Sequence, residues 1–146
     1  MARLIVEAVT DEAHGGDVVG DVLVFVSVSL ESDGKPVTGL KVENFRVASS
    51  IGSVINPVVT LVAEMNWEPD KQYKEPSGCY SVWITRGKAG PSDSPHWTKG
   101  ELYAFGIQVM RFEKQFVPGP KGKKPHWVEV PVDFGQTVVS VESLGE

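Results

Sequence analysis

The chain contains one cysteine in 146 residues, Cys79, and therefore cannot close an internal disulfide. Its fold must rest on packing, which is compatible with a reducing compartment. No stretch approaches the ~18 consecutive apolar residues of a membrane span. The N-terminus meets Glu7 after only three apolar positions and offers no signal-peptide core. We therefore expect no membrane span and a cytoplasmic or virion-associated protein, unless a leader has been trimmed.

An excess of positive charge is also missing. The 14 lysines and arginines face 19 aspartates and glutamates, so the formal net charge is −5. Proteins that bind phosphate backbones normally present a basic surface, so we expect no nucleic-acid partner. A sustained helical period is absent too, because no apolar spacing of three to four residues lasts three turns.

Catalytic and metal-binding motifs are equally scarce. The three histidines lack the short paired spacing of zinc ligands. There is no nucleophile-elbow motif and no Gly-rich phosphate loop before a helix. Cys79 lies beside an apolar strand and is interpreted as a half-buried, inert thiol. The sequence thus predicts no catalytic residues, no metal site, no cofactor and no enzymatic activity.

What the chain has in abundance is period-two alternation, the pattern of β-strands. In residues 22–30 every even position is Val or Leu, while Ser27 and Ser29 occupy the other side. Leu23 and Phe25 make the first half apolar on both sides. A strand covered on both faces is typical of the middle of a sheet, so we expect this one to be central.

Several other segments alternate in the same way. They comprise residues 2–9, 58–67, 80–84, 103–109, 128–134 and 137–141. Gly and Pro turn signals separate them, which favours a single-domain sandwich or barrel spanning residues 1–146.

Two of these segments carry sharper expectations. In residues 58–67 the odd positions are apolar, so Leu61 and Met65 are expected to face the core. In residues 128–134 the alternation predicts that Val128, Val130, Val132 and Phe134 share one face. Pro131 lacks the N–H that a ladder needs, which places its strand at an edge or beside a bulge.

Four blocks carry a resemblance to a known family. They are residues 33–40 (DGKPVTGL), 44–47 (NFRV), 78–82 (GCYSV) and 97–105 (WTKGELYAF). In this order they resemble bacterial immunoglobulin-like domains. The resemblance implies an all-β, immunoglobulin-like antiparallel β-sandwich of about seven to nine strands. It also implies adhesion, spacing or assembly, with no catalytic residues to transfer. Because the chain continues beyond the ~100 residues of a minimal module, we expect an extra C-terminal hairpin or strand pair.

One tripeptide, Pro-His-Trp, occurs twice, thirty positions apart. Its copies place His96 with Trp97 and His126 with Trp127. If both copies opened adjacent strands, two imidazoles and two indoles would form a binding patch for a sugar, a metal ion or a protein. In the alternative, each Trp seals the rim of the sandwich and each His faces solvent.

Three functions remain open at this level. The first is a non-catalytic module for protein binding or self-assembly through its loops and exposed sheet edges, with the basic residues 119–124 as a possible dock for an acidic partner. The second is a carbohydrate-binding module that stacks sugars on Trp67, Trp83, Trp97 or Trp127, since Trp83 alternates away from the apolar face of its strand. The third is an enzyme with residues 88–99 as a lid over His96.

Overall fold

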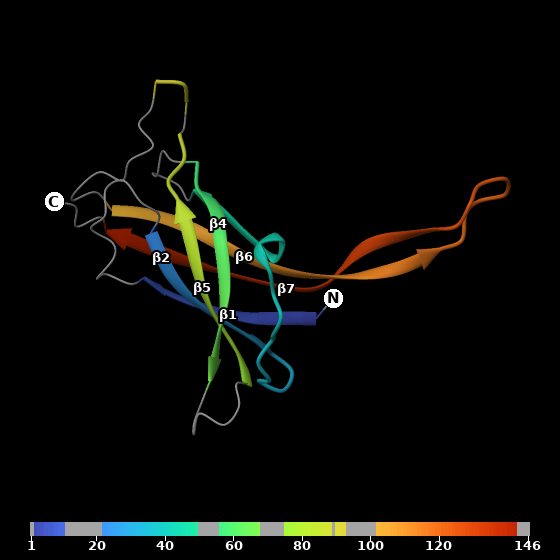
Figure 1. The fold of residues 1–146 in the computed structure, drawn as a ribbon, viewed down its shortest axis with the longest axis horizontal. Coiled ribbons are helices and arrows are strands. Elements are labelled where there is room, and N and C mark those ends of the chain that lie inside the picture. The colour runs from blue at the N-terminus through green and yellow to red at the C-terminus, as the bar shows by residue number, and fades with distance from the viewer. Residues whose placement is uncertain are drawn as a thin grey trace.

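A computed structural model describes residues 2–10, 22–49, 56–67, 75–88, 90–92 and 102–142. Within these ranges the chain forms seven β-strands, one short 3-10 helix and no α-helix (Figure 1). The elements are β1 (Ala2–Thr10), β2 (Val22–Leu30), η1 (Val42–Asn44), β3 (Phe45–Ser49), β4 (Val58–Trp67), β5 (Glu75–Thr85), β6 (Leu102–Val117) and β7 (His126–Glu142). The all-β prediction is confirmed.

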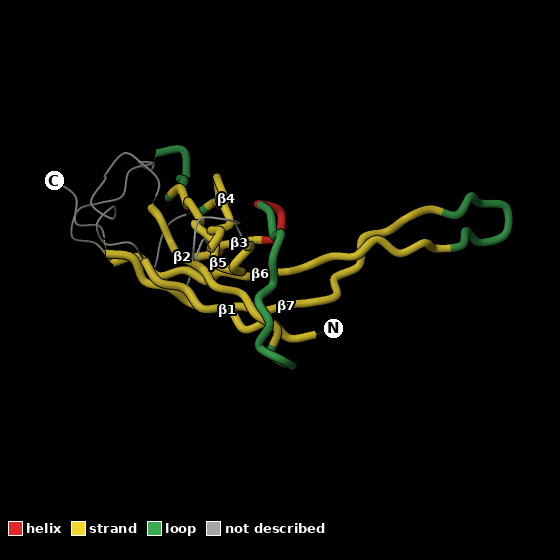
Figure 2. The backbone as a smooth tube through the Cα atoms, turned by 60° about the horizontal axis from the view of Figure 1, so that its bottom comes forward, coloured by secondary structure: helices red, strands yellow, loops and turns green. Residues whose placement is uncertain are grey.

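The seven strands form one curled sheet in the order β3-β6-β7-β1-β2-β5-β4. The sheet bends at β1, which pairs with β7 at its start and with β2 along the rest of its length. β1, β2, β5 and β4 thereby face β3, β6 and β7 (Figure 2). The β1–β7 pair is parallel, whereas the other pairs are antiparallel as expected.

Gly135 allows β1 to cross from one layer to the other. A Cβ on Gly135 would lie 2.5 Å from the backbone oxygen of Leu4 and 2.8 Å from a methyl carbon of Val6. Any side chain at this position would therefore push β1 away from β7. The two edge strands, β3 and β4, come into contact at the other side, so the curled sheet encloses its core as a half-barrel.

The core lies between the two layers and is built from the alternation seen in the sequence. β2 is central, between β1 and β5, and runs over the predicted residues. The fully buried side chains are Val22, Val24, Val26, Val28, Tyr80, Val82, Ile84, Phe105, Ile107 and Val109. They come from β2, β5 and β6, so these three strands hold the domain together.

The prediction for β4 is correct in its bounds but wrong in its face. Val59 is buried opposite Ile84, yet the ladder then shifts, so that Leu61 rather than Thr60 pairs with Trp83. Thr60 is thus the extra residue of a β-bulge, and its hydroxyl donates to the Trp83 carbonyl at 3.2 Å. A bulge reverses the alternation beyond it. Leu61 and Met65 therefore lie outside, 54% and 39% exposed.

The C-terminal strand pair exists in a different form from the one expected. β6 and β7 are single strands of 16 and 17 residues. Residues 128–134 and 137–141, which were predicted as two separate strands, both belong to β7. Between them the register shifts, since Arg111 pairs with Asp133 and Phe112 pairs with Pro131. Val132 is the bulged residue, which confirms a bulge beside Pro131.

The bulge at Val132 also corrects the expected face of β7. Beyond it, the side chains that share a side with Val128 and Val130 are those of Asp133 and Gly135. Phe134 lies on the opposite face, together with Pro131, Glu129 and Trp127. The prediction that Val128, Val130, Val132 and Phe134 share one face is therefore wrong.

Residues 33–40, the block that carried the family resemblance, form a turn and a following loop that hydrogen bonds and close packing hold against β2 and β5. The backbone N–H of Lys35 donates to the Asp33 carboxylate at 3.0 Å, and Gly34 supplies the positive φ of 71° that the turn needs. Pro36 then bridges to the end of β2. Gly78 of β5 packs so closely that a Cβ there would lie 2.7 Å from the Cβ of Pro36.

The Tyr80 hydroxyl fastens the rest of this block. It donates to the Val37 carbonyl at 2.7 Å and accepts from the Leu40 N–H at 3.2 Å, while its ring meets Phe45 edge-on at 5.4 Å. Burial raises the pKa of Tyr80 to about 12, because the phenolate would lose its hydration. The block is thus scaffold, held by a neutral buried phenol.

Candidate functional site

The most unusual part of the molecule is a two-stranded ribbon that leaves the sandwich. We call residues 112–131 the arm. Its strands pair with each other from Phe112–Pro131 out to Val117–His126, whereas β1 reaches β7 only at Asp133 and Phe134, and β3 reaches β6 only up to Val109. Figures 1 and 2 show the arm extending well away from the body. Its main-chain ladder therefore has no third strand on either side among the described residues.

The root of the arm is marked by an ion pair across the two strands. Arg111 and Asp133 face each other in the ladder, and a terminal guanidinium nitrogen of Arg111 contacts the Asp133 carboxylate. The Asp133 side chain is 5% exposed and that of Arg111 is 41% exposed. The pair lies next to the bulge at Val132, on the side of the body. An ion pair therefore joins the two strands at the point where the ribbon leaves the body.

One face of the arm is lined with aromatic side chains. The register places Phe112 opposite Pro131 and Phe116 opposite Trp127 on the same side of the ribbon. The rings of Phe116 and Trp127 meet edge-on, with centroids 5.4 Å apart and planes at 64°. Such a contact contributes roughly 0.5–1.5 kcal/mol beyond area burial. Even so, Phe116 is 54% and Trp127 65% exposed, so most of this apolar surface meets water.

The tip of the arm is a tight turn that presents positive charge. The N–H of Lys123 donates to the Pro120 carbonyl at 2.8 Å, and Gly122 adopts a φ of 89°. Positive φ at this turn position requires Gly or a close substitute. Three exposed lysines follow one another around the turn: Lys121, Lys123 and Lys124. The tip thus combines a fixed backbone with a concentrated positive charge.

The arm brings together only part of the predicted site. His126 and Trp127 lie near its end and are both exposed, so His126 faces solvent as the rim alternative expected, whereas Trp127, 65% exposed, does not seal the sandwich. His96 and Trp97 lie outside the described residues, so the convergence of the two copies stays a prediction. Trp83 lies on the outer side of β5 and is half-buried, in a layer that the arm does not join.

Phe116 was missed by sequence reasoning, although a signal for it existed. The turn Pro120–Lys123 is flanked by alternating segments, and a hairpin closed there pairs Phe116 with Trp127 directly. Cross-strand aromatic pairs are common stabilising units in hairpins.

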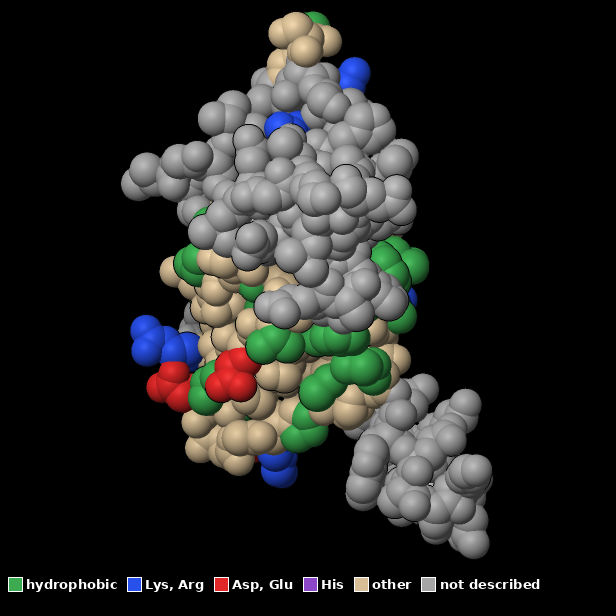
Figure 3. All heavy atoms as spheres, turned by 90° about the vertical axis from the view of Figure 1, so that its left-hand side faces the viewer, with side chains coloured by type: hydrophobic (Ala, Val, Ile, Leu, Met, Phe, Trp, Pro, Cys, Tyr) green, Lys and Arg blue, Asp and Glu red, His purple; other side chains and the backbone are tan. Residues whose placement is uncertain are grey.

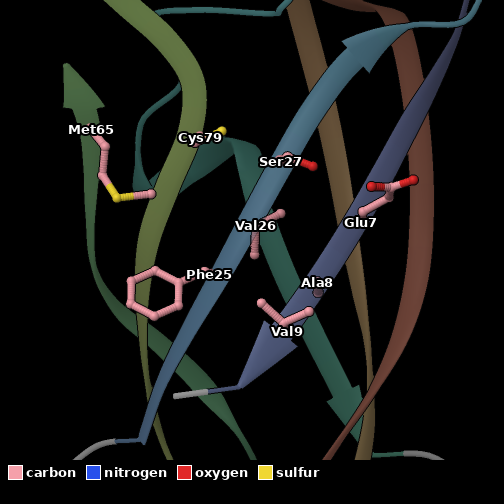
Figure 4. Close-up of a pocket in the computed structure, with 8 residues that line it drawn as sticks. All are labelled: Glu7, Ala8, Val9, Phe25, Val26, Ser27, Met65 and Cys79. Carbon is pink, nitrogen blue, oxygen red and sulfur yellow. The ribbon is translucent and has the colours of Figure 1, made fainter. Parts of the chain in front are cut away.

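A second candidate surface lies on the outer face of β1, β2, β5 and β4. There the structure forms an open hollow of about 210 Å³. Its lining includes Glu7, Val9, Phe25, Ser27, Met65 and Cys79 (Figure 4). The reversal of β4 at Thr60 turns Met65 outward, so the bulge helps to create this surface.

The hollow is mainly apolar with one acidic group beside it. Val9 lies opposite Phe25 in the ladder and is 63% exposed, and Met65 closes the other side. Glu7, two residues from Val9 on the same face of β1, is exposed. At the end of the molecule opposite the arm, hydrophobic side chains likewise come to the surface beside acidic ones (Figure 3).

Within the part of the chain that the structure describes, no three His, Cys, Asp or Glu side chains gather as a metal site would require. Cys79 is half-buried at the hollow, as expected of a packed thiol. No helix in the same part of the chain is long and apolar enough to cross a membrane.

Comparisons of the chain with protein-family models, with curated proteins and with solved structures find no match in any of the three. The function must therefore be argued from the geometry of the arm and the hollow.

Proposed function

We propose that the chain is a non-catalytic, immunoglobulin-like module for protein binding or assembly, and that the arm makes the contact. The observation that carries this proposal is the exposed Phe116–Trp127 pair near the end of a ribbon that has no third strand among the described residues. An isolated two-stranded ribbon is marginally stable in water. A partner that covers the aromatic face would supply the missing support.

The composition and rigidity of the arm favour a protein partner. Aromatic side chains bury roughly 150–250 Å² each and are enriched in protein interfaces. Phe116 and Trp127 hold each other in place before binding, and the Pro120–Lys123 turn fixes the tip. Groups that are ordered beforehand lose less entropy on association. The aromatic pair and the turn are therefore ordered before binding, while the ribbon as a whole would gain its missing support from the partner.

The family resemblance supports the same function without establishing it. Residues 33–40 and 78–82 resemble bacterial immunoglobulin-like domains, whose usual work is adhesion, spacing or assembly. In this chain those blocks hold the Tyr80 hydroxyl in its hydrogen bonds to Val37 and Leu40, which is a scaffold role. The contact surface is accordingly expected outside them, in the arm that extends the last two strands.

The decisive test removes the aromatic pair and spares the ribbon. The double variant Phe116→Ser/Trp127→Ser is compared with Gln115→Ser/Val128→Ser, a cross-strand pair on the opposite face. Each protein is immobilised and exposed to extract of the native organism, and its association state is measured by sedimentation. We expect partners or self-association to be lost in the aromatic variant alone. A parent chain that stays monomeric and retains nothing would refute the proposal.

Carbohydrate binding is a second candidate, favoured by the single observation that the Trp127 indole is 65% exposed on a rigid strand. Such a ring is a suitable platform for a sugar. Trp83 lies in the other layer and does not extend this platform. Titration with a panel of polysaccharides should quench tryptophan fluorescence in the parent chain and leave Trp127→Ala unchanged. Indifference of the parent chain to the whole panel removes this candidate.

A further inference from the structure

We propose, building on the assembly function assigned above, that the partner is a second copy of this chain, whose outer hollow receives the Phe116–Trp127 end of the arm. The arm of one copy and the hollow of the next would join copies head to tail. One interface would then cover both surfaces, the hollow of one copy and the aromatic face of the arm of the next.

The direction of β1 shows that a chain cannot make this contact with itself. β1 starts beside the root of the arm, where Ala2 pairs with Asp133, and runs parallel to β7, away from the tip. Val9 lies seven residues further on, roughly 20 Å at about 3.3 Å per residue. The last ladder pair of the arm, Val117–His126, lies a similar distance in the opposite direction. Figure 1 shows the end of β1 and the tip of the arm on opposite sides of the molecule, so the tip and the hollow that Val9 lines are far apart in one chain.

The hollow fits an aromatic side chain in size and chemistry. Its volume of about 210 Å³ has room for one large ring. Phe25 and Met65 line it, and a ring placed there would contact both an aromatic face and a thioether. Sulfur–aromatic contacts are favourable, and Met adapts its shape to the ring that it meets. Among the aromatic side chains that the structure describes, Trp127 is the most exposed, at 65%.

Charge favours the same pairing. The arm carries four lysines and two glutamates, whereas the rest of the chain carries ten basic and seventeen acidic residues. A net charge of +2 on the arm thus faces −7 on the remainder. At the hollow, Glu7 is exposed beside Val9 and lies within the reach of a lysine from the tip. Opposite charges of this kind steer association and fix orientation.

The contact is heterologous, because the two surfaces involved are different. Each copy that uses its arm still has a free hollow, and each copy that fills its hollow still has a free arm. Such contacts produce a ring if the rotation closes and an open filament if it does not. Assemblies larger than dimers are therefore expected.

The single native cysteine makes a covalent test possible. Cys79 lines the hollow, and Glu129→Cys places a second thiol on the aromatic face of the arm while retaining Phe116 and Trp127. Under mild oxidation we expect a ladder of covalent multimers. The matched control Val128→Cys places the thiol on the opposite face and should cross-link at least about tenfold less. Glu129→Cys/Cys79→Ser should stop at dimers, since only arm-to-arm bonds remain.

A charge reversal provides the second measurement. Glu7→Lys should weaken self-association about tenfold at low salt, measured by sedimentation equilibrium, and Lys124→Glu should restore it when both changes are combined. A parent chain that stays monomeric at high concentration, together with no ladder from Glu129→Cys, overturns the inference. If the aromatic variant nevertheless loses a foreign protein from the native extract, the arm is still a binding element and only the identity of its partner is wrong.

Discussion

β6 and β7 pass through two environments, the body and the arm, with similar residues in each. In the body, Phe105 and Ile107 of β6 are fully buried beneath β2 and β5. In the arm, Phe116 of the same strand is 54% exposed and Trp127 of β7 is 65% exposed. The side of the strand differs, because Phe105 and Ile107 lie on the core face of β6 whereas Phe116 lies on the opposite face. Beyond the ion pair between Arg111 and Asp133, moreover, no other described strand pairs with β6 or β7.

The largest test of this comparison exchanges one phenylalanine in each region. Phe105→Ala should lower the free energy of unfolding by about 3–5 kcal/mol, since it leaves a cavity between the layers. Phe116→Ala should lower it by roughly 1 kcal/mol or less, the contribution of an exposed ring pair. Urea unfolding followed by circular dichroism measures both. Equal losses would mean that the arm is part of the cooperative core.

Tyr80→Phe tests the scaffold at the centre of the body. Removing the hydroxyl leaves the Val37 carbonyl and the Leu40 N–H unpaired in the core, which should cost roughly 1–3 kcal/mol. The matched change in the arm, Trp127→Phe, removes no buried hydrogen bond and should cost about 0.5 kcal/mol or less. Thermal unfolding at neutral pH compares the two variants.

The same residue predicts a pH dependence at the alkaline end. The pKa of Tyr80 is about 12 in the folded chain against 10 for a free tyrosine, so the unfolded chain loses its proton first. Its contribution to stability is complete below pH 10 and is lost as the pH rises towards 12. The difference corresponds to at most about 3 kcal/mol. Denaturant unfolding between pH 9 and pH 12 should show a smaller decline in Tyr80→Phe; identical slopes would contradict the assignment.

At the boundary between body and arm, Asp133→Asn should have an intermediate effect. The Asp133 carboxylate is nearly buried and pairs with Arg111, so neutralising it leaves a cation without its partner. Because Arg111 is partly exposed, we expect a loss of roughly 1–2 kcal/mol rather than the larger cost of a fully buried pair. The control is Glu129→Gln, on the exposed arm opposite Lys114, which should cost less than about 0.5 kcal/mol. If Glu129→Gln cost more than Asp133→Asn, the boundary between body and arm would lie nearer the tip than Asp133.

The smallest effect is expected on the outer face of the body, which is as exposed as the arm. Leu61→Thr should change the unfolding free energy by about 0.5 kcal/mol or less, because the bulge at Thr60 turns Leu61 outward. Val59→Thr, one residue before the bulge, places a hydroxyl in the core and should cost roughly 1–2 kcal/mol. The order of these two variants checks the reversal directly.

Sequence reasoning predicted the fold well where strands are regular. β2 runs over the predicted residues, and the alternating positions of β5 and β6 form the core. The errors occur beyond the bulges at Thr60 and Val132. One extra residue reverses every later side chain, and nothing in the local composition announces it. Of the predicted site, His126 and Trp127 are exposed on the arm, Trp83 is half-buried elsewhere, and Phe116 was found only through the register.

The sequence by itself determined that this chain is all-β, that it has no disulfide to rely on, and which residues alternate. These properties are local or compositional, since the period of a strand is visible in neighbouring residues. Only the tertiary structure decided which alternating faces are buried. β6 carries its aromatic residues at odd positions in the body, where Phe105 is buried against the other strands, and at even positions in the arm, where Phe116 lies exposed on the opposite face. Burial depends on distant strands, and that is why the arm became visible only in three dimensions.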